Sequence, residues 1–344
     1  MKILGIAHSL PSSVVTNEQL VSRILRHELN TIPQADRARF TEDLCARFER
    51  AGAVTRFHRT PGEFAASFGI DAGRKALVRA GLGPADIDLL IYVGVGRGFL
   101  EPATANIFQH RLGLAHATCF DLLDACASWM RALDIAHHLL ARGLYRHVMV
   151  LNCEFNFEEF IRWDFRCVED LDHLWGGFTV GEAATATILG ADDADYHATF
   201  VTRGEHHGLC QIPLAHARNF LDGTPARCEA PPLHFFVFAA ELHQQAIAQL
   251  ARQFWDDPVL ASGHWDLVVG HSTSIPAAQS VTRKLRLDQA LAFETFSRYG
   301  NTVSASIPLG LSLALEGGRL ERGHRVLLVS ASAGLTTGFM SFRY

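Results

Sequence analysis

The sequence predicts an α/β fold built from a duplicated unit, and two observations lead to this prediction. Short apolar runs of strand length alternate with longer stretches in which apolar residues recur at helical spacing. This alternation is typical of right-handed crossovers in a mostly parallel sheet. In addition, residues 265–270 repeat the pattern of residues 87–93, and residues 304–329 repeat that of the helix and strand that follow Cys126. We therefore expect two related α/β units that meet at a pseudo-twofold axis.

The N-terminal part of the chain begins with a short strand, expected at residues 3–8. A helical stretch follows at residues 17–50 and is broken near Pro33, because proline interrupts a helix. A further helix is expected at residues 62–81, where side chains recur at helical spacing. These side chains are Phe64, Phe68, Ala72, Ala76 and Ala80.

Residues 89–93 form a continuous apolar run, which indicates a buried strand. The next expected helix covers residues 103–112, and a second apolar strand covers residues 147–152. Between the two units, residues 155–230 are rich in aromatic and histidine side chains and have weaker periodicity, apart from a strand-like stretch at residues 184–189. We expect much of this region to form loops that cover a pocket.

Composition limits the classes of protein to consider. The chain has 344 residues, of which 48% are hydrophobic and 19% are charged, as in a globular protein with a large core. A net charge of −5 argues against a nucleic-acid binder. From the first residues we expect no signal peptide, and no apolar run approaches the roughly 20 residues that span a bilayer. We therefore expect a cytoplasmic protein that binds neither nucleic acid nor membrane.

The seven cysteines are spread without Cys-x-x-Cys pairs, so neither a disulfide framework nor a zinc site is expected. One of them, Cys126, stands out by its position. A strand-like approach ends in a tight turn, and Cys126 falls at the start of a helical pattern that stops near Gly143. The positive end of a helix dipole lowers the pKa of a thiol and favours the thiolate. A lone cysteine is more often a small buried apolar residue, so this interpretation depends on residues further along the chain.

Those residues carry a resemblance that covers nearly the whole chain. The sequence resembles the thiolase superfamily and, within it, the β-ketoacyl-acyl carrier protein synthase III family. The matching segments are residues 80–88, 102–105, 109–113, 120–126, 270–271, 299–302, 305–308 and 334–336. The nucleophile, histidine and asparagine of the family match Cys126, His271 and Asn301, in the same order.

The resemblance implies a thiolase-like, duplicated α-β-α-β-α architecture of five layers with mixed sheets. Residues 1–175 would form the half that carries the nucleophile, and residues 176–344 the half that carries the histidine and the asparagine. It also implies a homodimer that needs neither a cofactor nor a metal. The substrates would be thioesters of coenzyme A or of an acyl carrier protein.

The chemistry explains why these residue types are needed. A thiolate is suited to accept an acyl group from a thioester. In the family an oxyanion hole forms from the backbone N–H of the nucleophile and a second N–H in the closing loop, here Ala333 and Gly334. A malonyl-type extender that loses carbon dioxide leaves an enolate, to which the N–H groups of His271 and Asn301 would donate. Each such donor is worth about 3 kcal/mol.

Two functions remain open. The first is decarboxylative Claisen condensation of an acyl group on Cys126 with a malonyl-type thioester. The second is acyl transfer from Cys126 to an alcohol or amine, with His271 as general base. An asparagine at position 301 favours condensation, because simple transfer has no enolate to hold. An intact set of Cys, His and Asn argues against a third possibility, a non-catalytic scaffold.

Some departures from the family pattern point to a specialised branch. Residues 272–274 read Ser-Thr-Ser where the family usually has Gln-Ala-Asn, and residues 127–129 read Ala-Ser-Trp where it usually has a small residue followed by Gly-Phe. The closing loop, residues 330–338, is also poorer in glycine. These differences suggest a role in secondary metabolism, or in the priming of fatty-acid or polyketide synthesis, rather than in housekeeping fatty-acid initiation.

Glu101 stands where the family usually has a bulky apolar residue that reaches into the partner subunit's acyl pocket. If it occupies that place, it would act as a base or select a polar acyl group. The alternative is a glutamate that simply faces solvent.

A basic cluster follows His271 on an expected helix. Arg283, Lys284 and Arg286 form one of the few such clusters in this acidic protein. Electrostatic docking of an acidic carrier would use such a surface. A solvated helix face explains the cluster equally well.

Overall fold

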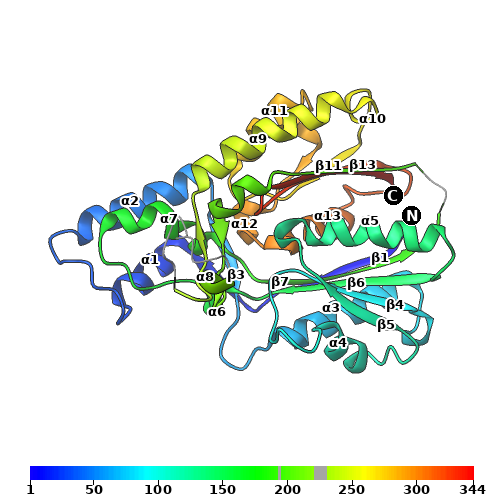
Figure 1. Ribbon diagram of the computed structural model, residues 1–344, viewed down its shortest axis with the longest axis horizontal. Coiled ribbons are helices and arrows are strands. Elements are labelled where there is room, and N and C mark those ends of the chain that lie inside the picture. The colour runs from blue at the N-terminus through cyan, green and yellow to red at the C-terminus, as the bar shows by residue number, and fades with distance from the viewer. Residues whose placement is uncertain (193–194, 221–230) are drawn as a thin grey trace.

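The computed structural model describes residues 1–192, 195–220 and 231–344. Two five-stranded sheets alternate with three layers of helices, so that the main body has five layers, α-β-α-β-α (Figure 1). Both sheets contain parallel and antiparallel strand pairs. The expected α/β class, the five layers and the mixed sheets are therefore confirmed.

The first sheet has the strand order β1-β7-β6-β4-β5. β4 lies between β5 and β6 and is parallel to both, whereas β7 is antiparallel to β1 and β6. All five residues of β4 are buried, as its apolar run predicts. The bounds are β1 (Lys2–Ser9), β4 (Leu89–Val93), β5 (Thr118–Leu122), β6 (His147–Glu154) and β7 (Ala183–Gly190).

The second sheet repeats this pattern, in the order β12-β11-β13-β14-β8. β11 is parallel to β12 and β13, and β14 is antiparallel to β13 and β8. The parallel trio followed by two antiparallel pairings reproduces the first sheet, which confirms the predicted duplication. The bounds are β8 (Tyr196–Thr202), β11 (Leu267–Gly270), β12 (Ala292–Phe293), β13 (Arg325–Ser332) and β14 (Thr336–Arg343).

Strand pairing also bears on where the two units divide. β7 follows the expected division at residues 175 and 176, yet it pairs with β1 and β6 in the first sheet. β8 pairs with β14 in the second sheet. We therefore propose to place the division between β7 and β8, because the backbone hydrogen bonds of a strand assign it to its sheet.

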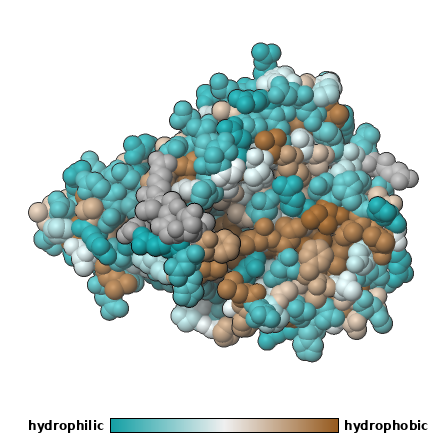
Figure 2. Space-filling model, viewed as in Figure 1, coloured by the Kyte–Doolittle hydropathy of each residue, from teal (hydrophilic) through white to brown (hydrophobic). Residues whose placement is uncertain are grey.

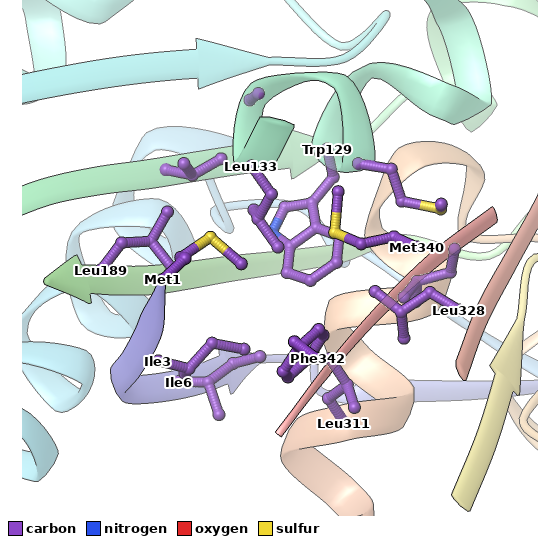
Figure 3. Close-up of a cluster of buried hydrophobic side chains, with 14 of the residues drawn as sticks. Met1, Ile3, Ile6, Trp129, Leu133, Leu189, Leu311, Leu328, Met340 and Phe342 are labelled. Carbon is purple, nitrogen blue, oxygen red and sulfur yellow. The ribbon is translucent and has the colours of Figure 1, made fainter. Parts of the chain in front are cut away.

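Two helices, α5 (Ser128–Ala141) and α13 (Ser306–Glu316), form the middle layer (Figure 1). The main core surrounds them: Trp129 and Leu133 of α5 lie near Leu311 of α13 and Met340 and Phe342 of β14 (Figure 3). Eight of the eleven residues of α13 are buried, because sheets and helices cover it on every side. The two candidate catalytic segments lead directly into these two helices.

The outer layers cover the far faces of the sheets. α3 (Ala65–Ala80) and α4 (Ala105–Arg111) cover the first sheet, and α9 (Ala239–Asp256), α10 (Pro258–Ala261) and α11 (Ile275–Lys284) cover the second (Figure 1). The helix expected at residues 62–81 is confirmed as α3. It ends at Gly81, whose φ of 67° is the left-handed conformation favoured at a helix C-cap.

A cap of short elements extends from one end of the layered body (Figure 1). Its two longest helices, α1 (Asn17–Arg26) and α2 (Arg37–Ala51), flank the break expected near Pro33. A separate core rich in phenylalanine holds the cap together, including Phe40, Phe48, Phe157, Phe165 and Phe178. The other elements are β2 (Ser13–Thr16), β3 (Thr55–His58), α6 (Phe157–Phe160), α7 (Leu171–Leu174), β9 (Cys210–Gln211), α8 (Ala217–Phe220), β10 (Phe236–Val237) and α12 (Phe296–Tyr299).

The region expected to consist largely of loops, residues 155–230, is therefore partly regular. It contributes α6, α7 and α8 as well as strands of both sheets. The final part of that expectation, residues 221–230, lies outside the described residues.

Within the described ranges, no helix is both long and apolar enough to cross a membrane.

Candidate active site

A cavity of 1440 Å³ brings the three predicted catalytic residues together. Cys126 of the first unit and His271 and Asn301 of the second all line its wall. Most of the remaining lining is apolar and comes from the cap, from α9 and from the inner face of α11. The three polar side chains thus line a mainly apolar cavity, which suits an acyl chain.

The backbone holds Cys126 in a braced turn between β5 and α5. A single 3₁₀ turn, Ala125–Ala127, carries the cysteine, and Ala125 has a φ of 44°. A residue other than glycine in this left-handed region is strained by about 1–2 kcal/mol. Ser128 supports the turn, because its hydroxyl accepts from Asp124 N–H at 2.7 Å and donates to Ala125 C=O at 2.6 Å.

Burial changes the expected acidity of the nucleophile. The surrounding protein raises the pKa of the Cys126 thiol well above its ordinary value, and Cys210, Glu154 and Asp124 raise it further. The expected low pKa is therefore wrong, because desolvation of the thiolate outweighs the backbone hydrogen bond that favours it. At rest Cys126 is a thiol, so a base must accept its proton before it attacks.

His271 follows β11 and is available as a neutral imidazole. Its backbone N–H donates to Val329 C=O at 2.9 Å, which extends the pairing between β11 and β13. Its Nδ1 lies 3.0 Å from the hydroxyl oxygen of Ser306. Burial, together with the nearby His243, lowers the pKa of His271 to about 4. The ring is therefore uncharged near neutral pH.

Asn301 is fixed by its backbone and by one side of its amide. Its N–H donates to Thr179 C=O at 2.8 Å, and its C=O accepts from Gly181 N–H at 3.1 Å. The side-chain Oδ1 accepts from Val303 N–H at 2.9 Å, which leaves the NH₂ group to donate. Gly300, with a φ of 69°, allows this close approach, since a Cβ there would collide with Thr179 C=O.

The closing loop meets the nucleophile's turn. The hydroxyl of Ser332 donates to Asp124 C=O at 2.9 Å, and Ala333 lines the cavity. Gly334 has a φ of 127° and lies in the turn behind it, outside the cavity wall. The second oxyanion donor expected at Ala333 or Gly334 stays a prediction, and Ala333 has the better position.

The other predicted residues lie outside the cavity. Glu101 is exposed, although Phe99 and Leu100 beside it line the cavity. The basic cluster Arg283, Lys284 and Arg286 is exposed at the C-terminal end of α11. Both assignments stay predictions.

The structure places two polar side chains at the site that the sequence did not predict. His243, on α9, lines the cavity, and its Nε2 lies 2.7 Å from the Thr273 hydroxyl. Burial lowers the pKa of His243. Ser306 falls within a matching segment, but no residue spacing revealed its contact with His271.

Among the described residues, no group of three or more His, Cys, Asp or Glu side chains could hold a metal ion.

Two family models match the chain. The model of 3-oxoacyl-[acyl-carrier-protein] synthase III matches residues 120–204, and the model of its C-terminal part matches residues 258–344. The curated β-ketoacyl-[acyl-carrier-protein] synthase III of Symbiobacterium thermophilum is 30% identical over 353 residues, which cover 99% of this chain and 97% of that protein. The enzyme of the same name from Erythrobacter litoralis is 28% identical, with coverages of 99% and 98%.

Solved structures share the fold. A cysteine variant of Xanthomonas campestris OleA, with bound lauric acid and lauroyl-CoA, has a TM-score of 0.83 at 22% identity and covers 99% of this chain and 98% of its own. The 3-oxoacyl-[acyl-carrier-protein] synthase III of Aquifex aeolicus has a TM-score of 0.80 at 23% identity, with coverages of 100% and 99%.

Other OleA structures carry substitutions of a glutamate or a histidine.

The family models match both units, and a relative reaches 30% identity over almost the full length. The chain therefore belongs to the 3-oxoacyl-[acyl-carrier-protein] synthase III family of cysteine-dependent, thioester-condensing acyltransferases.

Proposed function

We propose that this protein loads an acyl group from a thioester onto Cys126 and then condenses it with a malonyl-type thioester, with loss of carbon dioxide. The observation that carries this proposal is that Cys126, His271 and Asn301 all line the same cavity. Asn301 is important because its Oδ1 is already occupied and only its NH₂ group is left to donate.

Loading begins with proton transfer from the Cys126 thiol to Nε2 of neutral His271. The thiolate attacks the carbonyl carbon of the acyl thioester, and the charge on the carbonyl oxygen is stabilised by the N–H groups of Cys126 and Ala333. The tetrahedral intermediate then expels the carrier thiolate, which recovers the proton from Nε2. The products are acyl-Cys126 and the free carrier thiol, with no net change in protons.

Condensation takes place at the same three residues, Cys126, His271 and Asn301. The bond between the malonyl α-carbon and its carboxylate breaks, carbon dioxide leaves, and the electron pair forms an enolate. The N–H groups of His271 and Asn301 donate to the enolate oxygen, each worth about 3 kcal/mol. The α-carbon attacks the acyl carbonyl on Cys126, and the Cys126 thiolate departs. A proton from the medium restores the thiol, and the product is a β-ketoacyl thioester.

The size and lining of the cavity support a long aliphatic donor. Its 1440 Å³ exceeds the roughly 300–1,000 Å³ of most small-molecule sites. OleA, which shares the fold, is described with bound lauric acid and lauroyl-CoA. We infer that a medium- or long-chain acyl-coenzyme A or acyl-carrier thioester is the donor, used in a specialised pathway or in priming.

Acyl transfer to an alcohol or amine is the second candidate. The observation that favours it is the low pKa of His271, about 4, since a neutral imidazole can accept a proton from an incoming nucleophile. This reaction makes no enolate, so it does not need the amide donor of Asn301. The two candidates therefore differ in their dependence on that residue.

Substitution of Asn301 by Asp tests the proposal. Asp has nearly the same size but replaces the NH₂ donor with a charge that repels an enolate. We expect malonyl decarboxylation to fall by about a hundredfold or more, measured as carbon dioxide released from malonyl-coenzyme A. Acyl loading of Cys126, measured by mass spectrometry of the same sample, should be less affected. Equal decarboxylation rates in wild type and Asn301→Asp would contradict condensation and favour acyl transfer.

Homodimer formation is the third part of the proposal. β5 is an edge strand of the first sheet, and its Phe120 is 37% exposed. Nearby in the chain, Phe99, Leu100 and Leu123 are 52%, 75% and 60% exposed. Figure 2 shows apolar side chains gathered in a band across the middle of one face. Exposed apolar surface of this kind supports burial against a second subunit, which would bring Glu101 towards the partner's cavity.

A further inference from the structure

The hydroxyl of Ser306 lies outside the cavity wall, against the ring of His271. Ser306 is the first residue of α13 and is 3% exposed. Three groups surround its oxygen: Nδ1 of His271 at 3.0 Å, the hydroxyl of Thr302 at 3.2 Å and the carbonyl of Val303 at 2.9 Å. The contact with Nδ1 of His271 ties this hydroxyl to the site, although the proposed reaction steps assign Ser306 no role.

A count of protons and lone pairs links the hydroxyl to the tautomer of His271. A serine hydroxyl has one proton and two lone pairs. The Thr302 hydroxyl donates to one lone pair. When the Ser306 proton points to Val303 C=O, the second lone pair accepts from Nδ1–H of His271, so Nε2 carries a lone pair. When the hydroxyl turns its proton to Nδ1, the ring proton must be on Nε2.

Both positions of the hydroxyl leave the buried polar groups satisfied. Val303 C=O also accepts from the backbone N–H of Ser306, so it keeps a partner when the hydroxyl turns away. Nδ1 has the Ser306 oxygen as its partner in either form. Since a buried polar group without a partner costs about 1–3 kcal/mol, the absence of such a loss makes the two forms close in energy.

We propose that Ser306 is a positioning residue that holds the His271 ring in place while Nε2 presents either a lone pair or an N–H to the cavity. This inference rests on the proposed function, in which loading needs a proton acceptor at Nε2 and condensation needs a donor there. The two ring forms interconvert by exchange of one proton with water, and the hydroxyl only rotates. A single histidine can thus serve both half-reactions without moving.

Nitrogen-15 magnetic resonance of the full chain with labelled histidine tests the proposal directly. The His271 signals are assigned by their loss in His271→Ala. In the wild type we expect Nδ1 and Nε2 shifts between the protonated and unprotonated values, which report a mixture of tautomers. Ser306→Ala should move both shifts towards the form with the proton on Nε2. A single tautomer in the wild type, or unchanged shifts in Ser306→Ala, would overturn the proposal.

Ser312 supplies a matched control on the same helix. It is fully buried, and its hydroxyl oxygen lies 2.9 Å from Nδ1 of another histidine, His8, which does not line the cavity. Ser312→Ala therefore removes the same kind of serine–histidine contact from α13. It should leave the His271 signals and both half-reactions unchanged.

Kinetics provide a second measurement. Ser306→Ala should lower kcat for both loading and malonyl decarboxylation by up to about 100-fold, because a catalytic ring that shifts by about 1 Å can lose that much rate. KM should change little, because Ser306 does not line the cavity. Ser306→Thr, which keeps the hydroxyl, should recover most of the rate. A loss confined to KM, or no recovery in Ser306→Thr, would contradict the positioning role.

The two measurements separate this inference from the proposed function. If the wild-type protein does not decarboxylate malonyl thioesters, the proposed function fails, but the resonance shifts still decide whether Ser306 controls the tautomer. If decarboxylation occurs and the shifts do not respond to Ser306→Ala, only the inference about Ser306 fails.

Discussion

At the scale of single residues, the site depends on a half-buried thiol and a neutral base. Burial raises the pKa of Cys126 and lowers that of His271, so both groups are uncharged at rest. Such a pair avoids the cost of a buried charge until the substrate is present. The low pKa of His271 also means that the unprotonated ring persists well into the acidic range.

Replacement of the nucleophile tests the assignment of Cys126. Cys126→Ala should abolish acyl loading and all synthetic turnover, because no other group at the turn can form the thioester. His271→Ala should retain some loading but lose decarboxylation, since Asn301 alone remains to hold the enolate. Mass spectrometry after incubation with a panel of acyl thioesters measures loading and also identifies the donor. A covalent acyl group on Cys126→Ala would show that the nucleophile is a different residue.

The sequence could predict those side chains that motifs carry, but not those that only folding brings together. Cys126, His271 and Asn301 are recognised by their order, and all three line one cavity. Ser306 and His243 have no such signal, because their contacts join segments that are distant in sequence or only meet in space. The acidity of Cys126 was mispredicted for a related reason: burial depends on the whole cavity, whereas the helix dipole is local.

At the scale of elements, α11 has two faces with different roles. Its inner residues, including Ala278 and Val281, line the cavity, whereas Arg283 and Lys284 are exposed and do not line it. A carrier that docks on the outer face would therefore stand directly over the wall of the acyl pocket. This arrangement supports the basic cluster as a docking surface.

Reversal of charge on α11 tests carrier docking. Arg283→Glu with Lys284→Glu should raise KM for a carrier-bound donor by about tenfold at low salt, and added salt should weaken the wild-type interaction as well. The same pair of substitutions at Arg74 and Lys75, on the exposed side of α3, provides the control and should have little effect. Unchanged kinetics with the carrier-bound donor would exclude this surface.

Helices and strands whose apolar residues recur at a clear spacing could be predicted from the sequence. The short elements of the cap could not. The strand Leu89–Val93 and the helix Ala65–Ala80 match their expected positions, because a buried strand and an amphipathic helix each have a distinct pattern. α6 and α7 have only four residues each, too few for a helical period to appear. Their shape is instead set by the aromatic core of the cap, which includes Phe157 and Phe178.

At the scale of the whole molecule, the duplication divides the catalytic groups between two units. The turn that carries Cys126 leads into α5, and the segment that carries Asn301 leads into α13, in the shared middle layer. Neither unit contains a complete site. The proposed homodimer would add a third contributor, Glu101 of a second subunit.

Mixed dimers test whether Glu101 crosses between subunits. Glu101→Gln should lower turnover at least tenfold if the carboxylate acts as a base in the partner's cavity, and Glu101→Phe should shift preference towards aliphatic donors. When Glu101→Gln and Cys126→Ala chains are mixed, half of the sites in a heterodimer have both residues intact. Turnover, measured after reassociation of the two chains, should then partly return. Normal rates in Glu101→Gln, or no recovery on mixing, would leave Glu101 a solvent-facing residue.

The hydrogen bond from Ser332 to Asp124 C=O fastens the end of β13 to the turn that carries the nucleophile. Because this bond joins the two duplicated units, a small slide of one sheet past the other would pull the thiol and its partners out of register. The positions of the catalytic groups therefore depend on this contact between the two units. Heat or denaturant that disrupts the contact between the units would abolish activity while both sheets are still folded. Loss of activity should therefore precede loss of secondary structure.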